Sequence, residues 1–270
     1  MKNYRFFFSS LVIATLLCSC HNVKVEGNKF TLENVSFEMV DVEGGQFLMG
    51  DTTDFKHQVT LSSYKIGKTE VTQKLWELVM GSNPSEVIGP DLPVNCVSWD
   101  QCQEFISKLN KMTGYNFRLP TEAEWEFAAR GGMKSKGYVF SGSNEIDEIA
   151  WYSKNSNYKP QAVAKKKPNE LGLYDMSGNV NEWCNDWFLL FDKDEKPANN
   201  PQGPQEGGKH VYRGGAYDGG LSYTSVAERW GRTVEINSYY DEFFVNNRDC
   251  AYSNAKRKDI GLRLALSIEE

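Results

Sequence analysis

The sequence predicts a mixed α+β fold of short strands, three helices and long loops. Apolar residues in residues 37 to 66 follow strand-like patterns, and three segments between residues 72 and 131 carry apolar side chains at helical spacing. Beyond residue 132 turn-forming residues are frequent and long helical patterns are not evident. A chain of 270 residues is long enough to bury a sizeable core.

The N-terminus has the features of an export signal. Lys2 and Arg5 precede an apolar run at residues 6–17 that is short for a membrane span, and the run ends in LCSC, which resembles a bacterial lipobox. We therefore expect residues 1–19 to be a signal peptide and Cys20 to be lipidated, with a cleaved and unlipidated signal as the alternative. Residues 20–36 are polar and predict a tether for a domain at 37–270. The expected location is the bacterial cell envelope, at the outer membrane.

The strand-like part predicts one or two hairpins. Val40, Val42, Phe47 and Met49 flank a Gly-Gly pair at residues 44–45, a pattern typical of a hairpin. Residues 59–66 alternate in the same way and predict a further strand or hairpin.

The three predicted helices have identifiable ends. The first follows Thr72 and stops at Gly81, because glycine commonly ends helices. The second begins at Ser98, and the third begins at Thr121; each is followed three residues later by Gln or Glu, which completes a capping box. Residues 192–208 are rich in Pro, Asn, Gly and charge, and they predict an exposed loop.

Charge and cysteine content restrict the possible functions. The formal net charge of −6 argues against a nucleic-acid partner, because binding to phosphates needs a basic surface. Beyond Cys20 the chain has Cys96, Cys102, Cys184 and Cys250, and four cysteines allow three disulfide pairings that the sequence cannot choose between.

Several strings match one enzyme superfamily in the same order along the chain. They are GQFLMG (45–50), KTEVT (68–72), PVNCVSW (93–99), FRLPTEAEWE (117–126), NELGLYDMSGNV (169–180), RGG (213–215) and GLRL (261–264). The chain thereby resembles the formylglycine-generating enzymes, oxidases that convert a sulfatase cysteine to formylglycine. The resemblance covers roughly residues 37–268 and implies a single, irregular α+β domain of C-type-lectin-like type, with few helices and much ordered loop.

The segment that should carry the oxidase chemistry departs from the family pattern. In the family, the Arg-Gly-Gly tract is followed by a serine and two cysteines that bind copper, whereas this chain has Ala216, Gly219 and Thr224 at those positions. Copper(I) needs soft thiolate ligands, so we expect no copper and no catalytic residues here. We expect Arg213 and Arg263 to act as scaffold by binding loop carbonyls.

The resemblance also implies a structural calcium site. Residue-by-residue transfer gives Asp175 and Glu182 as carboxylate ligands and Gly178 and Val180 as carbonyl ligands. Asn181 stands where the family usually has tryptophan, which changes the local packing more than the ligands.

The main hypothesis is a non-catalytic envelope lipoprotein that binds a glycan, a peptide or an envelope protein. Its candidate binding residues are of types common in adaptable binding surfaces: Tyr217, Asp218, Tyr223, Arg229, Trp230, Tyr239 and Tyr240. Clusters at 237–241 and 252–254 also resemble the variable regions of retroelement-diversified binding proteins. One alternative is an oxidase with a rearranged centre in which Cys184 and Cys250 converge. Another is a structural component of an envelope secretion or motility complex.

Overall fold

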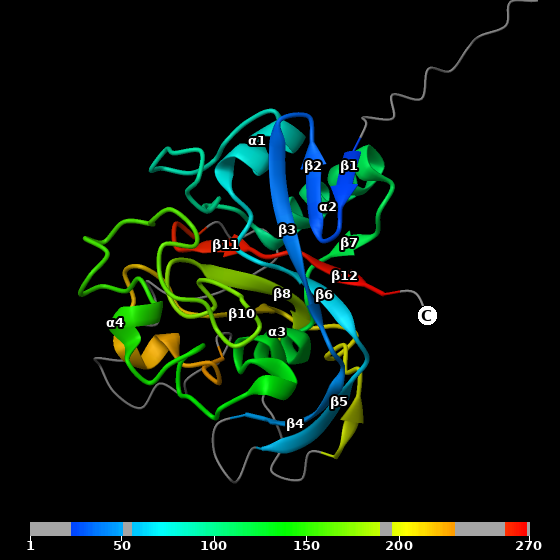
Figure 1. Cartoon of the computed structure of the whole chain (residues 1–270), viewed down its shortest axis with the longest axis vertical. Coiled ribbons are helices and arrows are strands. Elements are labelled where there is room, and N and C mark those ends of the chain that lie inside the picture. Colours follow the sequence, from blue (N-terminus) through cyan, green and yellow to red (C-terminus); the bar gives the residue numbers. More distant parts are fainter. Residues whose placement is uncertain (1–22, 51–55, 190–195, 230–256, 269–270) are drawn as a thin grey trace, which may run out of the picture.

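The computed structural model describes residues 23–50, 56–189, 196–229 and 257–268 (Figure 1). The strands are β1 (Val23–Glu26), β2 (Lys29–Leu32), β3 (Val35–Val42), β4 (Gly45–Met49), β5 (His57–Leu61), β6 (Tyr64–Gly67), β7 (Phe117–Arg118), β8 (Asn181–Trp187), β9 (Ala198–Asn199), β10 (His210–Arg213), β11 (Ile260–Leu262) and β12 (Ala265–Ser267). The helices are α1 (Gln73–Met80), α2 (Trp99–Thr113), α3 (Glu122–Ala129) and α4 (Ile146–Ile149), with 3-10 turns η1 (Gly132–Lys134) and η2 (Leu221–Thr224). Short strands, few helices and long ordered loops confirm the predicted α+β class.

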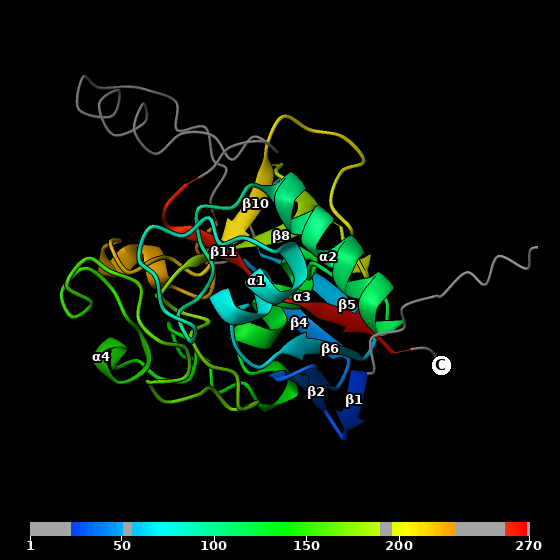
Figure 2. The same cartoon turned by 90° about the horizontal axis from the view of Figure 1, so that it is seen from above.

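The largest sheet has six strands in the order β1-β2-β3-β6-β12-β7, all paired antiparallel. Helices α1 and α2 cover one of its faces (Figures 1 and 2). Where the two helices meet, the rings of Trp76 and Phe105 stack at 4.9 Å with an interplanar angle of 7°. These rings join Phe30 and Met39 of the sheet in one buried cluster, so apolar burial holds the helices to the strands.

Two small sheets complete the fold and carry the segments that precede and follow β10. Strand β8 lies between β10, its antiparallel neighbour, and β11, its parallel neighbour. The other sheet has the order β4-β5-β9. Helix α3 contacts both small sheets, and its Trp125 and Phe127 belong to a second buried cluster. The phenol of Tyr64 donates a hydrogen bond of 2.6 Å to the carbonyl of Glu124 and so ties α3 to the large sheet.

The predicted hairpin at residues 44–45 is wrong. Strand β3 pairs with β6, and β4 pairs with β5, so the chain leaves one sheet at residue 43 and enters another. A second crossing at Ser62 and Ser63 separates β5 from β6. A side chain on Gly44 would collide with the backbone of residues 61–63, so the two crossings pass close to each other.

The predicted tether at 20–36 is also wrong from residue 23 onward. Residues 23–36 supply β1, β2 and the start of β3, which form one end of the large sheet. Phe30, Leu32 and Val35 are buried in the first core cluster. The apolar residues of this segment alternate along two short strands, and Phe30 packs on Tyr115 and Phe117, which are far away in the sequence.

All three predicted helices are confirmed with their starts, and the first also with its stop at Gly81. Ser98 and Thr121 both form complete capping boxes, with Gln101 and Glu124 respectively. Helix α1 begins after Thr72, which makes no side-chain cap, and stops at Gly81 in the left-handed conformation (φ 74°). In the described parts of the chain, no helix combines the length and apolarity needed to cross a membrane.

Candidate functional site

The segment after β10 turns sharply under two glycines. Gly214 and Gly215 have φ values of 102° and 75°, which favour glycine over residues with a side chain. A Cβ on Gly215 would lie 2.5 Å from the carbonyl oxygen of Tyr223, so this turn packs directly on the end of η2. The next turn is closed by Gly219, whose amide donates to the carbonyl of Ala216 at 2.9 Å.

The three positions that resemble the oxidase centre carry no redox-active group. Ala216 is buried and apolar. Gly219 has no side chain. Thr224 is fully buried, and its hydroxyl donates to the carbonyl of Leu221 at 2.8 Å, while its own carbonyl accepts from Ser177 at 2.7 Å. These contacts stabilise the loop and provide no soft ligand.

The described thiols do not form a pair near this segment. Cys102 and Cys184 are free and buried in the core, where burial raises the pKa of each thiol well above its usual range. Cys96 is half-buried and lies near Tyr217, and burial raises the pKa of its thiol too. Cys250 lies outside the described residues, so the proposed meeting of Cys184 and Cys250 stays untested.

The predicted binding residues differ in what they can offer a ligand. The Tyr217 ring is buried, its hydroxyl donates to the carbonyl of Lys258 at 3.2 Å, and burial raises its pKa. Asp218 is half-buried, and burial together with repulsion from Asp259 raises its pKa. Tyr223 is half-buried, against the turn at residues 219–220. Trp230, Tyr239 and Tyr240 lie outside the described residues.

Arg229 binds groups of the protein itself. Its guanidinium binds both carboxylate oxygens of Glu122 at 2.5 Å and also donates to the carbonyl of Leu189 at 3.1 Å. A bidentate Arg–carboxylate pair of this kind fixes geometry strongly. Arg229 is therefore a scaffold residue that holds Glu122 and the carbonyl of Leu189, and not a ligand contact as predicted.

Glu122 and Arg229 belong to a larger buried charge cluster that the sequence did not reveal. Glu126, one helical turn after Glu122 in α3, is fully buried and accepts from Arg213, Arg130 and the amide of Gly50. Arg213 also donates to the carbonyls of residues 226–228, which confirms its predicted scaffold role. The i, i+4 spacing of Glu122 and Glu126 was a visible signal, but nothing in the sequence identified their partners.

The four predicted calcium ligands have different surroundings. Both oxygens of Glu182 accept from Arg263, and one accepts also from the Trp125 indole at 2.7 Å, so this carboxylate is fully used. Asp175 accepts from the amide of Ala164 at 2.8 Å through one oxygen, while its buried Oδ1 has no partner. The tight turn at Gly178 brings its backbone against Trp151. The carbonyls of Gly178 and Val180 flank this turn in sequence.

These acids create an excess of buried negative charge. Glu70, Asp175 and Glu182 are all buried, with Arg263 as the buried positive partner. Arg263 also donates to the carbonyls of residues 67 and 174, which confirms its scaffold role. Burial and repulsion from Asp175 raise the pKa of Glu70, and burial raises that of Asp175 to about 6. The free oxygen of Asp175 fits a cation and Glu182 does not; among the described residues, no group of three His, Cys, Asp or Glu is placed to hold a metal.

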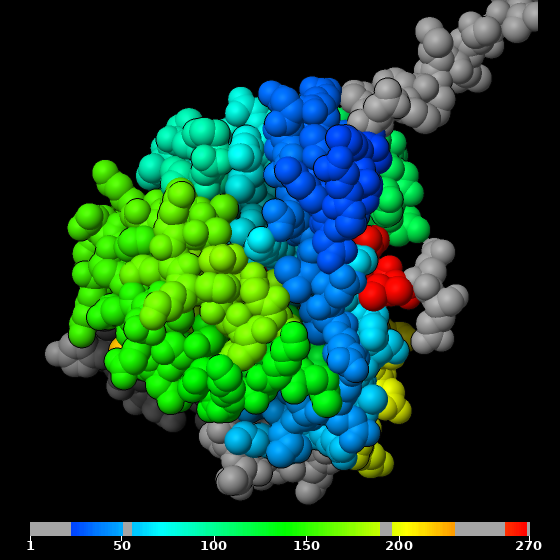
Figure 3. All heavy atoms as spheres, in the orientation of Figure 1, coloured from blue at the N-terminus to red at the C-terminus, as the bar shows by residue number. Residues whose placement is uncertain are grey.

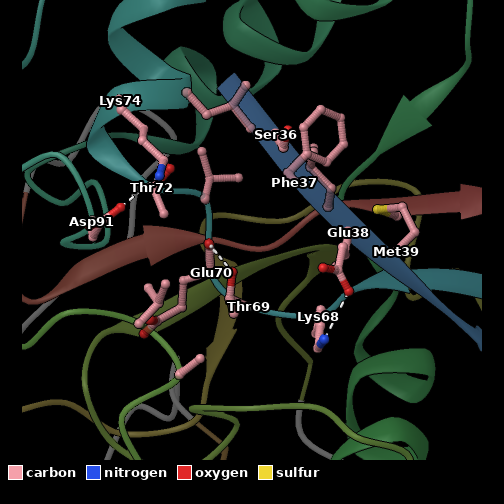
Figure 4. A pocket seen from close by; sticks show the side chains of 16 residues that line it. Ser36, Phe37, Glu38, Met39, Lys68, Thr69, Glu70, Thr72, Lys74 and Asp91 are labelled. Atoms are coloured by element: carbon pink, nitrogen blue, oxygen red, sulfur yellow. Dashed lines mark hydrogen bonds and ion pairs between the residues drawn. The ribbon is translucent and has the colours of Figure 1, made fainter. Parts of the chain in front are cut away.

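A separate pocket of about 240 Å³ opens between β3 and the segment joining β6 to α1 (Figure 4). Two ion pairs lie at its rim, Lys68 with Glu38 at 2.8 Å and Lys74 with Asp91 at 2.6 Å. Its walls mix charged and polar side chains with apolar ones. No motif in the sequence indicated this pocket, and its lining does not include the segment after β10.

Comparison with known proteins agrees with the fold. The model of the sulfatase-modifying factor enzyme 1-like domain matches residues 28–268. The chain belongs to this family. A protein named chaperone protein LppX, from Paenibacillus barcinonensis, is 39% identical, and the match covers 57% of this chain and 72% of that protein.

One further sequence relative and one solved structure are similar to this chain. The formylglycine-generating enzyme of Streptomyces coelicolor is 34% identical, and the match covers 57% of this chain but only 52% of the enzyme. Among solved structures, Treponema denticola variable protein 1 superposes with a TM-score of 0.76 and 32% identity, covering 89% of this chain and 98% of that one. The family therefore includes a protein named formylglycine-generating enzyme and proteins with other names.

Proposed function

We propose that this family member is a non-catalytic binding protein of the cell envelope, anchored by a lipid on Cys20. The observation that carries the proposal is the environment of Ala216, Gly219 and Thr224, which offers loop-stabilising contacts where the oxidase chemistry would need thiolates. Asp218 and Tyr223, both half-buried, are the described candidates for ligand contact. The relative named as a chaperone supports a polypeptide partner over a glycan.

A paired assay tests the non-catalytic part. The purified chain should show neither tight copper(I) binding nor conversion of a Cys-x-Pro-x-Arg peptide to the aldehyde. The Streptomyces enzyme serves as the positive control under the same conditions. Aldehyde formation by this chain would overturn the proposal and favour the rearranged oxidase centre.

A binding screen tests the other part. Peptide and glycan arrays probed with the folded chain should give a ligand whose binding is weakened by Tyr223→Ala but not by Tyr138→Ala, a half-buried tyrosine of another loop. Labelled fatty acid should be incorporated by the native chain and not by Cys20→Ser. Recovery of the protein only as a stoichiometric member of a membrane complex would favour the structural alternative.

We also propose a structural calcium ion beside Asp175, supported by its unpartnered buried oxygen and the surplus of buried carboxylates. Calcium should raise the melting temperature relative to chelator, and Asp175→Asn should abolish that rise. Glu145→Gln, an exposed site with the same change of charge, should retain it. Substitution of Glu182 is a poor probe, because it would also leave Arg263 unpaired.

A further inference from the structure

A lysine-rich loop lies directly against the segment that replaces the oxidase centre. Residues 150–169, here called the lysine loop, contain five lysines and no acidic residue, within a chain of net charge −6. Two hydrogen bonds hold the loop to the segment: the amide of Ser153 donates to Gly219 at 3.0 Å, and the hydroxyl of Ser156 donates to the carbonyl of Tyr217 at 2.6 Å. Figures 1 and 2 show the green to yellow-green loop beside the orange segment that contains η2.

Three of the five lysines are exposed and can form an ion pair with a ligand. Lys167 pairs with Glu148 at 3.0 Å, and Lys166 lies over the Trp151 ring while donating to the carbonyl of Asp147. Lys154, Lys159 and Lys165 are exposed, and none has an ion-pair partner among the described residues. Asp91, the acid that interacts with Lys165 at longer range, is already paired with Lys74. In Figure 3 the green to yellow-green part of the chain forms a broad area of the molecular surface.

The loop also presents an aromatic side chain in a strained backbone conformation. Asn157 and Tyr158 have φ values of 56° and 55°; asparagine tolerates this region, but a bulky residue rarely adopts it. Tyr158 is 67% exposed, so packing of its ring does not explain the conformation. The amide of Tyr158 donates at 3.0 Å to the Ser156 hydroxyl, the same group that donates to Tyr217. Strain that the surrounding structure maintains at an exposed aromatic residue points to a contact with a ligand.

We propose that the lysine loop is a docking surface for an acidic segment of a polypeptide partner. Lys154, Lys159 and Lys165 pair with its carboxylates, and the exposed Tyr158 packs on its apolar side chains. Ser156 is a positioning residue, because it holds Tyr158 and joins the loop to Tyr217. This inference rests on the proposed binding function and deepens it by naming the charge and class of the partner.

Poly-L-glutamate is the probe, titrated against the full folded chain at several salt concentrations. The triple substitution Lys154→Gln, Lys159→Gln and Lys165→Gln should weaken binding by about tenfold at low salt and flatten its salt dependence. The matched control is Lys29→Gln, Lys56→Gln and Lys196→Gln, three exposed lysines outside the lysine loop. Tyr158→Ala and Ser156→Ala should each weaken the binding of a glutamate–tyrosine copolymer more than the binding of poly-L-glutamate.

Equal losses in the two triple variants would overturn the inference, because the attraction would then depend on overall charge. Polygalacturonate or single-stranded DNA that binds more tightly than poly-L-glutamate at equal charge would overturn the assignment to a polypeptide. If poly-L-glutamate does not bind but an array ligand binds through Tyr223, the inference fails and the proposed function stands. If the chain forms the aldehyde and also binds poly-L-glutamate through these lysines, the non-catalytic proposal fails and the docking inference stands.

Discussion

At the scale of single residues, the buried charges should have the largest effects on the free energy of unfolding. Arg213 and Glu126 are both fully buried, and each completes hydrogen bonds that loops need. Removing two charges from water costs about as much free energy as their attraction returns, so the pair adds little to the net stability. Removing one partner is different, because the remaining charge stays buried without compensation.

Glu126→Gln should therefore lower the free energy of unfolding by about 3–5 kcal/mol. The substitution keeps the size of the side chain and removes the charge that faces Arg213. Glu104→Gln breaks an exposed i, i+4 pair with Lys108 and should cost less than about 1 kcal/mol. Urea denaturation of both variants measures the difference; equal effects would show that burial of the Arg213 pair does not matter.

At the scale of elements, the helix starts offer a direct comparison. Ser98 and Thr121 accept hydrogen bonds from the amides of Gln101 and Glu124, at 3.2 Å in each case, whereas Thr72 starts α1 without any such bond. The same residue type at two helix starts therefore makes different local contacts. The capping boxes explain why α2 and α3 begin where the sequence predicted.

Thr121→Ala should lower the free energy of unfolding by about 1 kcal/mol, and Ser98→Ala should do the same. Thr72→Ala should change it by less than about 0.5 kcal/mol, because no cap is lost. Chemical denaturation gives all three values. A Thr72 effect as large as that of Thr121 would contradict this assignment of the cap energies.

Across the whole molecule, buried aspartates should govern how stability depends on pH. Burial, assisted by repulsion from Glu122, raises the pKa of Asp186 to about 7, and burial raises that of Asp175 to about 6. Between about pH 4 and these values the folded state binds more protons than the unfolded state. Stability therefore falls as pH rises through this window, by at most about 1.4 kcal/mol per pH unit for each group.

We expect a higher melting temperature at pH 5.5 than at pH 8, and Asp186→Asn should reduce the difference. Burial lowers the pKa of His210, which opposes this trend as pH falls below about 6.5. The asparagine variant isolates the aspartate contribution, because His210 is unchanged. Melting curves in calcium-free buffer provide the measurement, and an identical pH profile in the variant would reject the role of Asp186.

The sequence by itself determined the features that are encoded over short stretches of chain. The helical period and the capping residues located α1, α2 and α3, and the ordered motifs identified the family. The absence of cysteine at Gly219 and Thr224 could be read directly. These signals need no distant partner, since each depends on residues within one turn or one motif.

Only the tertiary structure decided which distant segments meet. It placed residues 23–36 in the large sheet, paired β3 with β6 instead of β4, and joined Arg229 to Glu122. It also put the lysine loop beside Tyr217 and left Asp175 with a free oxygen. Strand pairing and buried ion pairs depend on contacts between residues far apart in the chain, and a strand pattern or a lone charge does not specify its partner.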